Sequence, residues 1–99
     1  MEECFLYKLH LARPDMLRVG PTPQEAAVVE EHSRYLKELA AKGRIILVGR
    51  TLNTDETTMG LAVFRAESEA AAREIMNNDP AVKSSVMSAT LFPFRVVLP

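Results

Sequence analysis

The sequence predicts an α+β fold in which a four-stranded antiparallel sheet carries helices on one face. Segments typical of strands and helices follow one another in the order β-α-β-β-α-β along 99 residues. A chain of this length builds only one hydrophobic core, and it contains no repeat or linker. We therefore expect a single domain over residues 1–99, with the ferredoxin-like arrangement that this order implies.

The first half of the chain predicts a strand, a loop and a long helix. Residues 4–12 are rich in aromatic and branched side chains, as strands are, whereas residues 13–23 contain three of the six prolines and predict a loop. Thr22 is a suitable N-cap for the helix, and Glu25 completes a capping box with it. Gly43 stands where the left-handed residue that ends such a helix is expected.

The second half predicts three more strands and a second helix. Short apolar runs predict the strands at residues 44–50, 60–66 and 90–98. Ser68 is a suitable N-cap for the helix that follows the third strand. Asp79 and Pro80 then end this helix and can begin a short helical turn. Pro93 lies inside the last strand and indicates an edge strand or a bulge.

Apolar side chains occur on both faces of the predicted strands. In the second strand we assign Ile45 and Leu47 to one face, and Ile46 and Val48 to the other. Two helices can cover only one face of a sheet, so the other face needs a cover from outside the chain. We expect a homodimer in which the sheets of two copies pack together.

Composition excludes several classes of function. Twelve basic and thirteen acidic residues give a net charge of −1 without a cluster of either sign, which argues against nucleic acid or a membrane as partner. Cys4 is the only cysteine, so no internal disulfide can form. We find no spacing typical of a metal site and no glycine-rich phosphate loop, and we therefore expect no metal and no cofactor. The first residues lack the pattern of a signal peptide, so we expect a cytoplasmic protein.

A few polar residues lie at unexpected positions and are the candidates for a site. His32 belongs to the apolar stripe of the first helix, where it is either a hydrogen-bonded core residue or a reactive group. Asp79 has a structural explanation as an N-cap worth ~1 kcal/mol, and a catalytic one as the partner of a base. His10 and Arg50 lie near strand ends, and Tyr7 lies within a strand.

The motifs E-H-x-x-Y-L at 31–36 and D-P-A-V-K at 79–83, with glycines at 43 and 49, resemble the YciI-like (YCII-related) family. The resemblance extends over about residues 4–95. It implies a ferredoxin-like domain that forms a dimeric α/β barrel, and a His-Asp pair that corresponds to His32 and Asp79. Many relatives have Gly-Pro where this chain has Gly49 and Arg50, and Arg50 would add a positive charge able to hold a carboxylate or enolate.

Two hypotheses about function remain open. The first is a small cofactor-independent enzyme, a lyase or isomerase that transfers a proton on a small organic acid. His32 would be its base and Asp79 would orient the imidazole, while Arg50, His10 and Tyr7 would contact the substrate. The second is a non-catalytic dimeric module that binds a small acidic metabolite or a protein partner.

Overall fold

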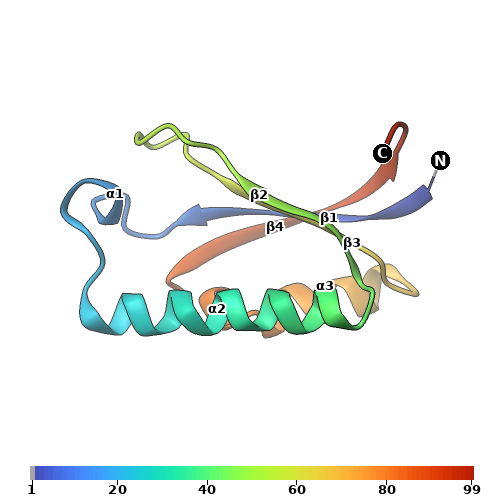
Figure 1. Cartoon of the computed structure of the whole chain (residues 1–99), viewed down its shortest axis with the longest axis horizontal. Helices are drawn as coiled ribbons and strands as arrows, with labels where there is room; N and C mark the ends of the chain where they lie inside the picture. The colour runs from blue at the N-terminus through green and yellow to red at the C-terminus, as the bar shows by residue number, and fades with distance from the viewer. Residues whose placement is uncertain (1) are drawn as a thin grey trace.

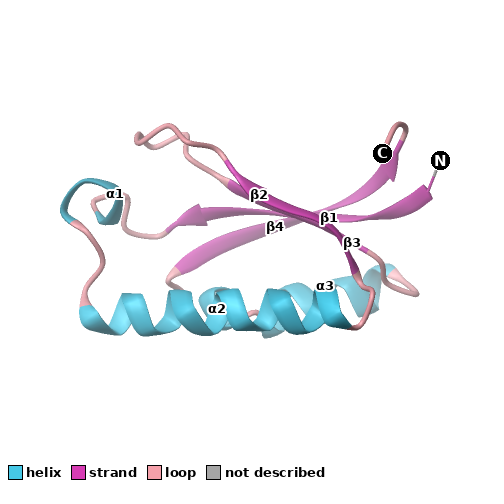
Figure 2. Cartoon of the chain, in the orientation of Figure 1, coloured by secondary structure: helices cyan, strands magenta, loops and turns pink. Residues whose placement is uncertain are grey.

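The computed structural model describes residues 2–99 and contains four strands and four helices (Figure 1). In chain order these are β1 (Glu2–Leu11), α1 (Met16–Val19), α2 (Pro23–Ala41), β2 (Ile45–Arg50), β3 (Gly60–Phe64), α3 (Glu69–Asn78), α4 (Pro80–Lys83) and β4 (Met87–Val96). The strands form one antiparallel sheet in the order β2-β3-β1-β4. The helices α2 and α3 lie along the same face of it (Figure 2). The predicted ferredoxin-like fold is confirmed.

The register of the sheet explains which side chains face the helices. Tyr7 of β1 pairs with Ala62 of β3 and with Leu91 of β4, so these three residues share the helix-covered face. β4 is an edge strand, as its proline indicated, and its pairing with β1 keeps one register through Pro93. Proline has no amide hydrogen to donate between strands. An edge strand tolerates Pro93 because one of its sides pairs with no other strand.

A β-bulge in β2 changes which residues lie on each face of this strand, and one predicted assignment was wrong. The register between β2 and β3 shifts between Ile45, which pairs with Phe64, and Leu47, which pairs with Val63. Leu47 therefore lies on the face opposite to Ile45, whereas strict alternation placed them together. Val48 pairs with Ala62 and so faces the helices. The prediction was wrong here because the extra residue reverses the alternation beyond it.

The core lies between the sheet and the helices. Tyr7 and Phe64 are fully buried, and their rings meet edge to face with centroids 5.4 Å apart. Leu36 and Leu39 of α2 and Met76 of α3 close this core from the helical side. The apolar stripe predicted for the first helix thus faces the sheet, and α3 buries apolar residues against the same core.

The predicted ends of the helices are also found. The capping box of α2 is complete, with the backbone amide of Glu25 donating to the Thr22 hydroxyl at 3.1 Å and the Thr22 amide donating to the Glu25 carboxylate at 2.8 Å. Gly43 has a φ of 75° just beyond α2, and Ser68 caps α3. The short helix α1 was missed within the predicted loop, because its N-cap, Asp15, makes no side-chain capping bond.

The second face of the sheet carries no helix of the described chain (Figure 1). Leu47, Phe92 and Phe94 are 58%, 42% and 39% exposed, respectively, and all three lie on this face by the register of the strands. Among residues 2–99, no helix has the length and apolar character needed to cross a membrane.

Candidate functional site

Helix α2 positions His32 against the sheet. The helix buries Leu36 and Leu39, and His32 lies one turn before Leu36 on the same side. The imidazole is 13% exposed, so it is neither a surface residue nor sealed in the core. Part of the imidazole ring is therefore accessible to solvent, although His32 belongs to the apolar stripe.

Asp79 occupies the break between α3 and α4. It is the N-cap of α4, with Pro80 at the first helical position, and its Oδ1 accepts a hydrogen bond from the amide of Ala81 at 3.0 Å. The residue is 0% exposed, and a buried carboxylate must be compensated by donors or positive charge. The predicted cap is present, but one amide does not explain complete burial.

His32 and Asp79 form a hydrogen-bonded pair. The imidazole Nδ1 lies 2.7 Å from Oδ1 and 2.8 Å from Oδ2 of Asp79. An ionised carboxylate only accepts, so Nδ1 carries the proton in this bond. In the neutral imidazole, Nε2 then keeps its lone pair and can act as a base. The contact between these two residues, 47 positions apart in the chain, is thus established.

Tyr7 supplies a further donor to Asp79. Its hydroxyl donates to Oδ2 at 2.8 Å, and the residue is 0% exposed. Burial, and then the neighbouring Asp79 carboxylate, raise the pKa of Tyr7 far above its usual range, so the hydroxyl keeps its proton. Tyr7 was expected to contact a substrate, but the structure places it against Asp79 and not along the cleft.

Tyr35 also donates a hydrogen bond through its hydroxyl, but to the backbone and not to Asp79. Its hydroxyl donates to the carbonyl of Ile75 at 2.7 Å, so it ties α2 to α3. Burial, with a smaller contribution from Asp79, raises the pKa of Tyr35. Tyr35 is partly buried against the core, so it has a packing role.

A cleft of about 450 Å³ opens beside His32, within the range of small-molecule sites. It lies between α2 and the ends of β2 and β3, and Leu17 of α1 belongs to its lining. Its lining comprises Leu9, His10, Leu11, Leu17, Val29, His32, Ser33, Leu36, Val48, Gly49, Arg50, Thr58, Met59, Gly60, Leu61, Ala62 and Met87. Of the predicted site residues, His32, Arg50 and His10 therefore share the cleft, while Asp79 and Tyr7 stand behind His32.

The two polar residues at the strand ends differ in how they are held. His10 is fixed by a hydrogen bond from its Nδ1 to the carbonyl of Thr58 at 3.1 Å. Arg50 is exposed, and its Nε donates to the carbonyl of Thr51 at 3.2 Å. The lining residues Ser33 and Thr58 were missed, because Ser and Thr are too common in a sequence to be singled out.

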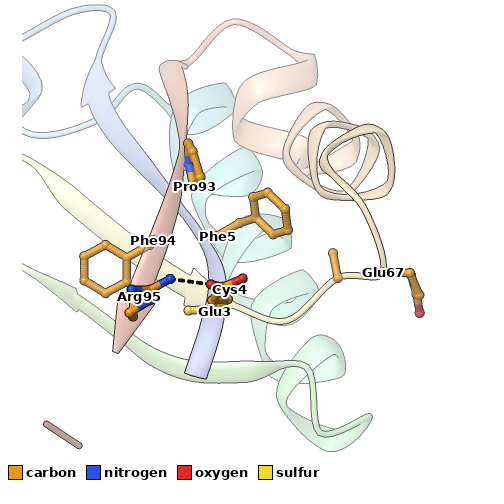
Figure 3. Close-up of a pocket in the computed structure, with 8 residues that line it drawn as sticks. Glu3, Cys4, Phe5, Glu67, Pro93, Phe94 and Arg95 are labelled. Atoms are coloured by element: carbon orange, nitrogen blue, oxygen red, sulfur yellow. Dashed lines mark hydrogen bonds and ion pairs between the residues drawn. The ribbon is translucent and has the colours of Figure 1, made fainter. Parts of the chain in front are cut away.

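A second hollow, of about 530 Å³, lies at the opposite end of the sheet (Figure 3). Its charged residues are already paired, Arg95 with Glu3, and Glu67 with Arg44 at 3.0 Å. Cys4 lines it but is 4% exposed. In the part of the chain that is described, no three His, Cys, Asp or Glu side chains converge as ligands for a metal ion.

Comparisons with known proteins agree with this architecture. The family model described as YCII-related domain matches residues 6–95. Among solved structures, the chain is similar to 5-chloro-2-hydroxyhydroquinone dehydrochlorinase (TftG) from Burkholderia phenoliruptrix AC1100, in complex with 2,5-dihydroxybenzoquinone. The TM-score is 0.64 and the identity is 21%, and the match covers 92% of this chain and 93% of that chain. No curated protein matches the sequence significantly.

Proposed function

Because the chain belongs to the YCII-related domain family, we propose that it is a small enzyme that transfers a proton on an organic acid, with His32 as the base. The observation that carries the proposal is the pair of contacts, 2.7 and 2.8 Å, between Nδ1 of His32 and the buried Asp79 carboxylate. A carboxylate on one ring nitrogen makes the other a stronger base and orients it.

The proposed chemistry uses the ring nitrogen of His32 that does not contact Asp79. His32 lines the cleft, so Nε2 is available to take a proton from a carbon next to a carbonyl group. The C–H bond breaks, an N–H bond forms, and the electron pair moves to the carbonyl oxygen as an enolate. Returning the proton to another carbon is an isomerisation, whereas expelling a group from the neighbouring carbon is an elimination. The structural neighbour is named a dehydrochlorinase, and an elimination of this kind belongs to the same class.

The other residues of the site have distinct parts in this proposal. Asp79 orients His32 and stabilises its positive charge after the proton is taken. Tyr7 and the amide of Ala81 hold Asp79 in place, which makes Tyr7 a positioning residue. Arg50 at the cleft supplies positive charge for the enolate or for a carboxylate, and His10 lines the cleft near it.

Proton exchange tests the catalytic role before a natural substrate is known. Carbonyl compounds with an acidic C–H are incubated with the protein in D₂O, and the loss of the C–H signal is followed by NMR. We expect wild type to accelerate exchange of at least one of them, and His32→Asn to lose the acceleration. Glu31→Gln, at an exposed neighbouring position of α2, is the matched control and keeps it. Equal exchange by wild type and His32→Asn would reject His32 as the base and favour the non-catalytic binding module.

We also propose that two copies associate through the face of the sheet that the helices leave open. The exposed apolar side chains Leu47, Phe92 and Phe94 support this partner, since covering them removes apolar surface from water. Sedimentation should show a dimer for wild type and a monomer for Phe92→Lys. Val19→Lys, at an apolar position that is 65% exposed on α1, is the control and stays dimeric. A wild-type monomer at micromolar concentration would overturn this assignment.

A further inference from the structure

The cleft beside His32 contains a single permanent charge, and that charge is positive. Arg50 is the only Lys, Arg, Asp or Glu among the residues that line it. Its guanidinium donates through Nε to the carbonyl of Thr51, which leaves the terminal nitrogens for a ligand. Among the side chains of residues 3–99, no carboxylate forms an ion pair with Arg50. The cleft is therefore suited to one anionic group of a ligand, and no carboxylate in its lining would repel that group.

The walls of the cleft are mainly apolar. Leucines of β1, β3, α1 and α2 belong to the lining, and Val29, Val48, Met59 and Met87 add to its apolar part. Ser33 and Thr58 are the only residues with hydroxyl groups in this lining, so a ligand with several hydroxyl groups would lose more hydrogen bonds to water than it gained, at a cost for each unpaired group. The volume of about 450 Å³ accommodates a six-membered ring with substituents. The body of the ligand should thus be compact and apolar.

We propose that the substrate is a ring-bearing monoanion, and this inference rests on the proposed role of His32. The apolar ring lies against the leucine, valine and methionine wall, and one carboxylate or ionised hydroxyl group lies on Arg50. The acidic C–H then faces Nε2 of His32. A dianion is disfavoured because its second charge would be desolvated without a second cation.

Four probe compounds separate the contributions of the ring and of the charge. They are cyclohexanecarboxylate, cyclohexanemethanol without the charge, acetate without the ring, and cyclohexane-1,4-dicarboxylate with a second charge. Binding is followed by chemical-shift changes of the backbone amides of the wild-type protein. We expect cyclohexanecarboxylate to bind about tenfold or more tightly than each of the others. Acetate or the dicarboxylate binding as tightly would overturn the proposed ligand class.

Two pairs of variants assign the preferences to residues. Arg50→Met should weaken the binding of cyclohexanecarboxylate to the level of the neutral alcohol. Arg73→Met, on the exposed face of α3 outside the cleft, should leave this binding unchanged. Val48→Thr keeps the side-chain shape and should weaken the binding of the ring compound but not that of acetate. Val97→Thr, outside the cleft, is the control for this variant. Unchanged affinity in Arg50→Met, with amide spectra that show a folded protein, would contradict the inference.

The outcome is separable from that of the catalytic proposal. Binding at equilibrium does not need a base, so His32→Asn should bind cyclohexanecarboxylate within a few fold of wild type. If ring monoanions bind but no compound exchanges its proton, the catalytic role alone is rejected. Exchange of an open-chain acid, with no binding of the ring compounds, would reject the ligand class alone.

Discussion

Two carboxylates at helix N-termini, Glu25 and Asp79, each collect several donors but lead to different chemistry. Glu25 accepts from the Thr22 amide at 2.8 Å and from Arg13 through Nη2 at 2.5 Å and Nε at 2.9 Å. Asp79 accepts from Tyr7, His32 and the amide of Ala81 at 2.7–3.0 Å. Both arrangements begin as helix caps.

The difference lies in the charged partner. Arg13 is always protonated, and it also donates to the carbonyl of Gly20, so its pair with Glu25 fixes the segment that contains α1. His32 offers one nitrogen to Asp79 and leaves the other beside a cleft. A carboxylate bound to arginine thus holds the fold together, whereas one bound to histidine leaves a group that can exchange a proton.

The largest expected effect is that of removing the Asp79 carboxylate. Asp79→Ala leaves the hydroxyl of fully buried Tyr7 and Nδ1 of His32 without their acceptor, and we expect a loss of about 3 kcal/mol or more. Urea unfolding measures this loss. Ser68→Ala removes a comparable cap at the surface and is expected to cost about 1 kcal/mol. Equal losses in the two variants would mean that Asp79 is only a cap.

Tyr7→Phe should have an intermediate effect. It removes one donor from a buried carboxylate, which we expect to cost about 2 kcal/mol. Tyr35→Phe is the matched control, because its hydroxyl donates to a backbone carbonyl and its loss is expected to cost about 1 kcal/mol. In the exchange assay, Tyr7→Phe should also slow turnover, which Tyr35→Phe should not. An unaltered rate in Tyr7→Phe would remove its positioning role.

Glu25→Gln should have the smallest effect at neutral pH and should show itself through pH dependence. The side-chain hydrogen bonds from Arg13, and then the bond from the Thr22 amide, lower the pKa of Glu25 from 4.5 to about 2. The ionised form is favoured in the folded state, so its stabilisation is complete above pH 4.5 and is lost as the pH falls through about 2. Unfolding measured over this range should show a steeper loss of stability for wild type than for Glu25→Gln. Parallel curves would contradict the assigned pair.

The sequence was sufficient for features that depend on local chemistry. The capping box at Thr22, the cap at Ser68 and the left-handed Gly43 all follow from a few neighbouring residues, and all are present. The bulge at Ile46 was not predictable, because the surrounding run of apolar residues fits either face. The short helix α1 was missed because prolines surround it and no side chain caps it.

The site was less accessible from the residues alone. His32 could be singled out on its helix, but its pairing with Asp79 was implied by the family resemblance and not by spacing. The bond from Tyr7 to Asp79 joins positions 72 apart, and no pattern within a strand indicates such a partner. Contacts of this kind depend on how the helices pack on the sheet, which local preferences do not specify.

The central claim is that Asp79 keeps the proton on Nδ1 of His32 and leaves Nε2 free. ¹⁵N NMR of the imidazole rings at neutral pH tests it directly, with His10→Gln used to assign the two histidines. We predict an Nδ1–H signal for His32 in wild type that is lost in Asp79→Ala. His10 should keep its own Nδ1–H signal in both proteins, because Thr58 and not Asp79 holds it. A His32 ring with its proton on Nε2 in wild type, or with the same spectrum after the substitution, would contradict the account.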